Sequence, residues 1–398
     1  MKLTLLLDLD DTLLDNKMET FIPAYLGALG QHLSAHLDLQ KLGPVMMSAT
    51  EEMFKNTQID RTLKETFSPH FYPALDLDEA QVRPDIARFY AEVFPTLRGF
   101  TKPQKATIPL IREAERRNWR VAIATNPIFP QAAIRHRLEW AGIPAGQHDF
   151  TVIPSYEQFH FAKPNPAFFA ELLARIGWPE GKILMVGNDP DHDIRGASQM
   201  GIATFWISNG QPYPEGFPAP KASGKLEDLL PWLDSVSEEA LTPNYRLTSA
   251  ITATLHGIPA ALLMLTDGIP PEIWERNTPA GNLNLTEIVS HLRDVEREVN
   301  LPRLEKIVRE ANPFIPGVDA DAWIATRKYH TQNGSAALRE FIAARKQTLA
   351  LLASLSPDDW ARPAQHALLG PTTLHELADI IARHDRMHIR QAHTQING

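Results

Sequence analysis

Three aspartates stand close together near the start of the chain, directly after a short apolar run. In the segment LTLLLDLDDTLLD, Asp8, Asp10 and Asp11 fall within four positions. Like charges at this spacing repel one another unless a cation or hydrogen-bond donors compensate. Carboxylate oxygens are ligands that Mg²⁺ prefers, so a bound Mg²⁺ would relieve this repulsion. The spacing therefore indicates an ion-dependent site, and Asp11 is interpreted as a turn residue within it.

Other polar side chains follow later apolar runs. Thr125 and Asn126 end one run, Lys163 lies in AKPNPAFF, and GNDPDHD contains Asp189 and Asp193. If these runs are strands of a parallel sheet, the side chains beyond their carboxyl ends meet at one edge, where ligands bind. Acids, a hydroxyl and a lysine around Mg²⁺ suit a phosphoryl group. One aspartate could then attack phosphorus to form an aspartyl phosphate.

A second set of candidate ligands consists of histidines in the last third of the chain. His384 and His388 are four positions apart in ARHDRMHIRQ, so on a helix they share one face. His291 lies in another amphipathic segment, EIVSHLRDVE. Facing helices can bring three imidazoles together, and such a set suits Zn²⁺, Ni²⁺ or Fe²⁺. The alternative is that all three are ordinary packed or surface residues.

The elements that must position the acids alternate between strand and helix patterns. Short apolar runs predict strands at residues 3–7, 121–125, 150–154, 183–187 and 203–207. Strands joined by helices predict an α/β Rossmann-like core with a parallel sheet covered on both faces. Residues 16–98 show mainly helical patterns, far more than a usual strand-to-helix connection. They are expected to form an inserted helical cap.

The remainder of the chain has a different pattern. Four amphipathic segments, at residues 245–265, 286–310, 335–355 and 373–395, predict an all-α four-helix bundle without further strands. A cluster of Pro, Gly and Ser precedes this part. We therefore predict an α/β domain at residues 1–237 and the bundle at residues 238–398.

Composition limits the classes of partner. The chain has 398 residues, a net charge of −9 and no cysteine. The acidic balance argues against nucleic acid or an anionic membrane as partner, and thiolate ligands and cysteine nucleophiles are excluded. The first apolar run is too short for a secretion signal, and no stretch of about 18 uninterrupted apolar residues was found. These features predict a cytoplasmic protein without a membrane span, and they leave its oligomeric state open.

The segments DLDDTL, ATN, KPNPAFF and GNDPDHDIRGA resemble, in this order, the motifs of the haloacid dehalogenase-like (HAD) hydrolases. The resemblance covers roughly the first 235 residues and implies a C1-type helical cap. It also implies that Asp8 is the nucleophile and Asp10 the general acid/base. The family's true dehalogenases lack an acid at the position of Asp10. Phosphoryl transfer is therefore favoured over dehalogenation.

The same resemblance assigns roles to the other polar residues. It implies that Thr125, helped by the backbone at Asn126, binds phosphoryl oxygens, and that Lys163 neutralises nucleophile and phosphate. The implied Mg²⁺ ligands are Asp8, the carbonyl of Asp10, Asp189 and Asp193. Many members have Gly-Asp-Ser in the fourth motif, where this chain has Gly187, Asn188 and Asp189. Whether Asn188 or Asp189 approaches the ion is left open.

These observations predict a Mg²⁺-dependent phosphatase that hydrolyses a small phosphomonoester, with a small phosphorylated metabolite as its partner. A phosphomutase or a phosphonate-cleaving relative on the same scaffold is the alternative, because the cap carries no decisive motif.

The second half has a resemblance of its own. LTEIVSHLRDVE and HDRMHIRQ look like segments of the DinB-like family, over roughly the residues from Asn244 onward. The resemblance implies that His291, His384 and His388 form a triad for a divalent metal. The bundle is then either a metal-dependent catalyst or a non-catalytic metal-binding or sensing module.

Overall fold

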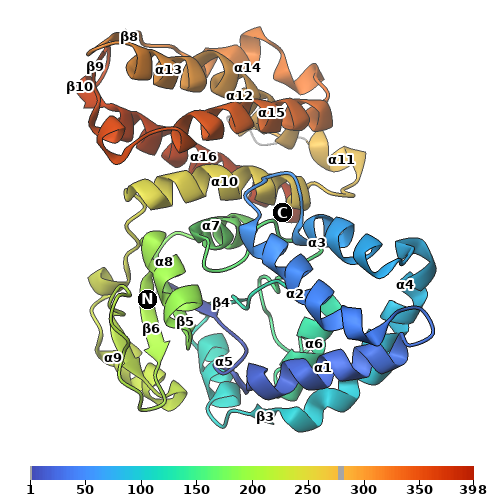
Figure 1. The fold of residues 1–398 in the computed structure, drawn as a ribbon. Coiled ribbons are helices and arrows are strands. Elements are labelled where there is room, and N and C mark those ends of the chain that lie inside the picture. The colour runs from blue at the N-terminus through green and yellow to red at the C-terminus, as the bar shows by residue number, and fades with distance from the viewer. Residues whose placement is uncertain (1, 277–281) are drawn as a thin grey trace. The chain divides into compact units, whose positions relative to one another are not determined.

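The computed structural model describes residues 2–276 and 282–398. The chain divides into two compact units. The first comprises Met1–Phe169 and Glu180–Asn244, and the second comprises Ala170–Pro179 and Tyr245–Gly398. The first contains a parallel sheet and an inserted group of helices, and the second is mainly helical (Figure 1).

The sheet of the first unit has five parallel strands in the order β4-β1-β5-β6-β7. The strands are β1 Leu3–Leu7, β4 Arg120–Ile123, β5 Lys182–Gly187, β6 Ala203–Ile207 and β7 Ala222–Gly224. Strands β1 and β6 are buried along their whole length, as expected of continuous apolar runs in a sheet covered on both faces. Because β1 lies between β4 and β5, the residues that follow these three strands meet at one edge. The predicted α/β Rossmann-like core is confirmed.

Two details of the sheet differ from the prediction. Residues 150–154 form no strand: they make an isolated bridge between Phe150 and Val121, in which Thr151 N donates to Val121 O at 2.9 Å and Ile123 N donates to Val152 O at 3.0 Å. This segment lies beside edge strand β4, and Pro154 has no N–H group with which to continue a ladder. The strand prediction there is wrong. The sequence pattern also missed β7, because Ala-Ser-Gly is not an apolar run.

Helices surround the sheet. Those of the first unit are α5 Thr107–Arg116, α6 Gln131–Trp140, α8 Gly196–Gln199 and α9 Leu229–Ser235, with shorter helical turns η4 Pro190–Arg195, η5 Leu226–Asp228 and η6 Glu238–Leu241. Helix α7 Pro166–Arg175 begins in the first unit and continues into the segment Ala170–Pro179 of the second. Helix α6 buries Ile134, Arg137 and Leu138 on one face. An arginine on that buried face is unusual, and it belongs to the site described below.

The predicted helical cap is confirmed. It consists of α1 Met18–His32, α2 Leu39–Lys55, α3 Leu63–Phe71, η1 Pro73–Leu75, α4 Glu79–Arg88, η2 Phe89–Val93 and η3 Phe94–Phe100. Figure 1 shows α1 to α4 in blue, grouped together outside the sheet. A short antiparallel pair, β2 Leu14–Asp15 with β3 Lys102–Pro103, joins the two ends of the insertion.

The second unit contains the predicted four-helix bundle. Its long elements are α10 Thr248–Leu265, α12 Leu285–Val295 continued by η7 Glu296–Asn300 and α13 Leu301–Arg309, α15 Gly334–Ala353 and α16 Leu374–Asn397. Helix α12 packs against α15 and α16, and α10 packs against the same two helices (Figure 1). The shorter helices are α11 Pro271–Trp274, α14 Ala322–Thr326, η8 Tyr329–Thr331 and η9 Pro357–Ala361.

The bundle departs from the prediction in two places. The helix expected over residues 286–310 contains a π-helical turn, Glu296–Asn300, before Pro302. Proline has no N–H group and its ring clashes with the carbonyl four residues earlier, which loosens that turn. The expectation of no further strands is wrong, because β8 Phe314–Ile315, β9 Pro363–His366 and β10 Gly370–Thr373 form a small sheet. These strands of two to four residues carry no alternating apolar pattern.

One helix in the described ranges is long and apolar enough to cross a membrane by length and composition. This helix, Thr248–Leu265, has a mean hydropathy of 1.4, and 61% of it is buried inside the protein. Core helices of bundles satisfy the same test.

Candidate active site and candidate metal centre

Asp8, Lys163 and Asp193 form a buried ionic cluster beyond the strand ends. Lys163 Nζ donates to Asp8 Oδ1 at 2.8 Å and to Asp193 Oδ1 at 2.5 Å. Burial alone would lower the pKa of Lys163, but the carboxylates of Asp193 and Asp8 raise it above its ordinary value. The pKa of Asp193 is raised, first by burial and then by the neighbouring Asp8 carboxylate. A lysine that stays charged between two acids can also stabilise charge on a bound anion.

The approach of Asp193 to the cluster depends on Gly187. A Cβ atom on Gly187 would lie 2.2 Å from Asp193 Oδ2, so no larger residue fits without displacing this carboxylate. The same Asp193 oxygen accepts a hydrogen bond from the backbone N–H of Asp189 at 2.9 Å. The end of β5 thus fixes Asp193 from two sides.

Asn188 and Asp189 point in different directions. Thr12 Oγ1 lies 3.0 Å from Asp8 Oδ2 and 3.2 Å from Asn188 Oδ1, so the Asn188 amide oxygen shares a neighbour with Asp8. The Asp189 carboxylate instead accepts hydrogen bonds from the N–H groups of Asp191 and His192 and caps the turn that begins there. Of the two side chains, that of Asn188 is turned toward Asp8.

The side chain of Asn126 forms hydrogen bonds with the main chain of Lys163. Its Oδ1 accepts from Lys163 N at 3.1 Å, and its Nδ2 donates to Lys163 O at 3.3 Å. This pair of bonds holds the segment that carries the lysine beside the end of β4. Sequence reasoning had considered only the backbone of Asn126 as a phosphoryl contact. Thr125 is buried and lines a cavity at this edge of the sheet.

Asp10 is held by two donors that sequence reasoning did not consider. Asn16 Nδ2 donates to Asp10 Oδ1 at 2.7 Å, and Arg137 Nη1 donates to Asp10 Oδ2 at 2.5 Å. Burial raises the pKa of Asp10 above its ordinary value, although the Arg137 guanidinium opposes this shift. Asp11 adopts a φ of 56° and accepts from Asn16 N at 3.0 Å, which agrees with a turn residue.

A single cavity of about 570 Å³ collects the residues predicted for this site. The predicted residues that line it are Asp8, Asp10, Thr125, Asn126, Lys163, Asp189 and Asp193. Sequence reasoning gave no role at this site to Thr12 and Asn16, which hydrogen-bond to the acids, or to Arg137, which lines the cavity. Thr12 was identifiable because it belongs to the same motif as the acids. Arg137 could have been identified because it falls on the apolar face of its helix.

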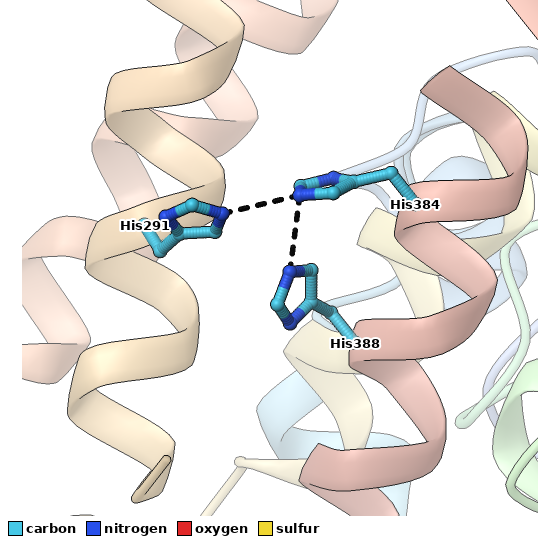
Figure 2. Close-up of side chains that lie close together, drawn as sticks. All are labelled: His291, His384 and His388. Carbon is cyan, nitrogen blue, oxygen red and sulfur yellow. Dashed lines mark hydrogen bonds between the residues drawn. The ribbon is translucent and has the colours of Figure 1, made fainter. Parts of the chain in front are cut away.

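The three histidines of the bundle converge, as Figure 2 shows. His291 lies on α12, and His384 and His388 lie on α16. His384 Nε2 is 3.1 Å from His291 Nε2 and 3.1 Å from His388 Nε2. One ring nitrogen carries either a proton or a lone pair, so it cannot donate to one neighbour while accepting from the other. A cation that accepts all three lone pairs resolves this conflict.

Burial keeps two of these histidines neutral. It lowers the pKa of His291 to about 4 and that of His388 to about 3. The neighbouring His384 ring is the second cause and lowers both pKa values further by charge repulsion. Neutral imidazole is the form that binds metals. His388 Nδ1 is 2.8 Å from Gln391 Oε1, which orients this ring. The potential ligand atoms lie within 4.8 Å of one another.

The parallel sheet, the helical insertion after β1 and the acids at the strand ends define a capped α/β protein with a carboxylate-rich site. The chain belongs to the haloacid dehalogenase-like hydrolase family, whose match covers residues 3–201. Residues 254–392 match the DinB superfamily. The two resemblances noted in the sequence are confirmed.

Curated relatives cover part of the chain. The phosphoserine phosphatase of Thermus thermophilus is 31% identical over 134 residues, which are 34% of this chain and 52% of that protein. The pyrimidine 5'-nucleotidase YjjG of Escherichia coli is 31% identical over 118 residues, 29% of this chain and 50% of that protein. The chain thus spans about half the length of these curated relatives.

Solved structures resemble each half. The 2-haloacid dehalogenase from Pseudomonas syringae is 22% identical with a TM-score of 0.43, covering 59% of this chain and 99% of that one. YfiT from Bacillus subtilis, described as a probable metal-dependent hydrolase, is 20% identical with a TM-score of 0.35, covering 39% and 88%. At these values the likeness bears on neither activity nor substrate.

Proposed function

We propose that the first unit is a Mg²⁺-dependent phosphatase that hydrolyses a small phosphomonoester through an aspartyl phosphate on Asp8. The observation that carries this proposal is the Lys163 ammonium between the carboxylates of Asp8 and Asp193, at 2.8 and 2.5 Å, in the wall of a cavity. Phosphoryl transfer needs an oriented nucleophile and fixed positive charge for the phosphoryl oxygens. The names of the relatives, among them a phosphoserine phosphatase, support the same reaction class.

The reaction has two displacement steps. An oxygen of Asp8 attacks phosphorus, and the bond between phosphorus and the ester oxygen breaks while Asp10 gives its proton to the leaving alkoxide. Asp10 then takes a proton from water as the water oxygen attacks the phosphorus of the aspartyl phosphate. Inorganic phosphate leaves, and the Asp8 carboxylate is restored. The raised pKa of Asp10 favours the protonated form that the first step requires.

The donor set fits Mg²⁺, because it consists of hard oxygen atoms. The residues proposed to hold the ion are Asp8, the carbonyl of Asp10, Asp193 and either Asn188 or Asp189. The orientation of the two side chains favours Asn188, because its amide oxygen and the Asp8 carboxylate both lie within hydrogen-bond distance of the Thr12 hydroxyl. When bound, the ion would neutralise charge on the phosphoryl oxygens. Thr125, the backbone at Asn126 and Lys163 are the proposed contacts of the phosphoryl group.

The test uses p-nitrophenyl phosphate with the full chain. Asp8→Asn should lower phosphate release more than about a thousandfold while the far-ultraviolet circular dichroism stays unchanged. The matched control is Asp76→Asn, because Asp76 has an exposed side chain in the cap and a φ of 57° that asparagine also tolerates. Chelation of Mg²⁺ should abolish activity reversibly. Wild-type turnover by Asp8→Asn contradicts the proposal.

The nature of the product separates hydrolysis from its alternatives. A phosphatase releases inorganic phosphate and the alcohol, whereas a phosphomutase returns an isomeric phosphate ester. A phosphonate-cleaving relative would release phosphate from a carbon–phosphorus bond. Phosphorus NMR of reactions with phosphorylated metabolites distinguishes the three.

For the bundle we propose that His291, His384 and His388 hold a divalent transition metal such as Zn²⁺, Ni²⁺ or Fe²⁺. The convergence of three Nε2 atoms, with two of the imidazoles held neutral, supports this. The bundle acts either as a metal-dependent catalyst or as a binding and sensing module. We further propose a domain boundary near residue 237, a cytoplasmic location, and no membrane or nucleic-acid partner.

Elemental analysis of the purified full chain tests the metal site. The wild type should carry close to one transition-metal ion per chain, and His388→Ala should lose it. His330→Ala is the control, since His330 is an exposed histidine of the same unit. Equal metal content in wild type and His388→Ala would contradict the assignment. Relaxation of water protons around a bound paramagnetic metal then shows whether a coordination position is open to solvent.

A further inference from the structure

Most charged side chains that line the cavity lie at the end that carries the candidate active site. This charged cluster comprises Asp8, Asp10, Asp11, Lys163, Asp189 and Asp193, with Arg137 beside it. The cap contributes the opposite wall, and in the described ranges the only charged side chain among these cap residues is Glu19. The other cap residues there are aliphatic, aromatic or methionine side chains apart from Thr50.

This cap wall is formed by ordered, packed side chains. Leu29 and Phe71 are 3% and 2% exposed, and Phe67 stacks on Phe71 with ring centroids 4.7 Å apart. On the other side of the cavity, Phe129 packs against Tyr25 with centroids 5.5 Å apart. The apolar character of the wall is therefore a property of the packed structure.

The cap wall offers a polar ligand few hydroxyl groups, which belong to Tyr25, Thr50, Tyr72 and Tyr90. Tyr25 and Tyr90 hydrogen-bond to each other at 2.9 Å, so part of their hydrogen-bonding capacity is already used. A leaving group with several hydroxyls or an ammonium group would give up its hydrogen bonds to water and find few replacements here. An apolar leaving group would instead remove apolar surface from water.

We propose that the substrate class is a phosphomonoester of an apolar alcohol, either aliphatic or aromatic, whose hydrocarbon part lies against the cap wall. This inference rests on the proposed phosphatase function of the same site. The cavity volume, about 570 Å³, lies in the range of pockets that enclose small organic ligands. The phosphoryl group would sit at the end that carries Asp8 and Lys163.

The test compares esters that differ in one property at a time. In the series ethyl, butyl and hexyl phosphate the chemistry of the leaving group is nearly constant, and kcat/KM should rise about fourfold for each added methylene group that is buried. Propyl phosphate should be hydrolysed with a higher kcat/KM than glycerol 3-phosphate, which has the same carbon skeleton with two added hydroxyls. O-phosphoserine should be a poor substrate for the same reason.

A pair of matched substitutions locates the effect. Leu26→Asn places an amide in the cavity wall and should flatten the dependence of kcat/KM on chain length. Leu39→Asn is the control, because Leu39 lies in the cap outside the cavity and is 54% exposed. This control should keep the wild-type slope.

The outcomes separate the two proposals. Phosphate release from every ester with no rise along the alkyl series, or a preference for glycerol 3-phosphate over propyl phosphate, overturns the apolar substrate class and leaves the phosphatase proposal intact. No release from any ester, p-nitrophenyl phosphate included, overturns the phosphatase proposal itself.

Discussion

The ammonium group of Lys163 lies 2.8 Å from the carboxylate of Asp8, with 3% and 8% of the two side chains exposed. Lys163→Met would leave Asp8 and Asp193 as buried carboxylates without this counter-charge. Removing one partner of a buried pair costs about 3–5 kcal/mol of unfolding free energy. Urea unfolding should show a loss of this size, and added Mg²⁺ should restore part of the stability but little of the activity.

The control for Lys163→Met is Lys102→Met, which removes an exposed lysine of the short strand β3. It should match the wild type in both stability and turnover. A Lys163→Met protein that unfolds at the wild-type urea concentration would show that the two carboxylates do not depend on this lysine.

A second prediction concerns Arg137, which donates to Asp10 at 2.5 Å and is almost completely buried. It does not have to touch the substrate to matter, because it sets the position of the proposed acid/base group. Arg137→Met should lower kcat by up to about 100-fold with a smaller effect on KM, as expected when a catalytic group is misplaced by about 1 Å. Arg135→Met, an exposed arginine on the same helix, is the control. A rise in KM at unchanged kcat would instead indicate that Arg137 binds substrate.

The two neighbours Asn188 and Asp189 give a third prediction. Asn188→Ala should raise the Mg²⁺ concentration needed for half-maximal activity, because it removes an oxygen beside Asp8. Asp189→Ala removes two hydrogen bonds at the start of a helical turn and should cost about 1 kcal/mol of stability. Mg²⁺ titrations of both variants distinguish the roles, and the reverse result would identify Asp189 as the ligand.

Much of this architecture could be predicted because it depends on short-range patterns. Apolar runs identify β1, β5 and β6, and the residues that follow a run must lie at the end of a strand. Asp8 and Lys163 are 155 positions apart, yet the order of elements in a parallel sheet is enough to place them together. The position of His384 and His388 on one face of a helix follows from the helical repeat alone.

What escaped prediction depends on tertiary contacts. The partnership of Arg137 with Asp10 joins residues 127 positions apart and follows no local pattern. The Asn188 side chain is oriented by a hydrogen bond from the hydroxyl of Thr12, a residue to which sequence reasoning had given no role. The small sheet of β8, β9 and β10 forms because its backbone groups find partners in the folded chain, and its strands are too short for a periodic pattern.

A fourth prediction concerns the buried ionic network of the bundle. Arg345 donates to both carboxylate oxygens of Glu296, at 2.7 and 2.8 Å, and to Asp385 at 2.6 Å, and all three side chains are 0% exposed. Arg345→Met should lower the unfolding free energy by about 3–5 kcal/mol, since two buried carboxylates lose their partner. Arg339→Met, an exposed arginine of the same helix, should lower it by less than about 0.5 kcal/mol.

The stability of the Arg345→Met protein is measured by thermal unfolding, and its metal content also tests the candidate metal centre. Asp385 lies next to His384 in sequence, with Asp385 Oδ1 3.7 Å from His384 Nδ1. A displaced Asp385 should therefore weaken metal binding at the triad as well. Stability equal to that of Arg339→Met would show that the network contributes little net free energy.

The last prediction is a pH dependence that originates at His256. Its Nδ1 donates to Thr252 O at 2.8 Å, and its pKa is lowered, first by burial and also by the nearby Arg345 guanidinium. A histidine in the unfolded chain has a pKa of about 6.5. As the pH falls through this value the unfolded state binds a proton that the folded state does not, so stability present above about pH 6.5 is lost below it.

The test is the unfolding free energy of wild type and His256→Gln between pH 7.5 and pH 5. The wild type should lose stability faster as the pH falls, with a difference in slope of at most about 1.4 kcal/mol per pH unit for one group. His330→Gln controls for the loss of an exposed imidazole in the same unit and should keep the wild-type slope. Parallel curves for wild type and His256→Gln would mean that this histidine binds its proton equally well in the folded and unfolded chain, and that its burial does not disfavour the charged form.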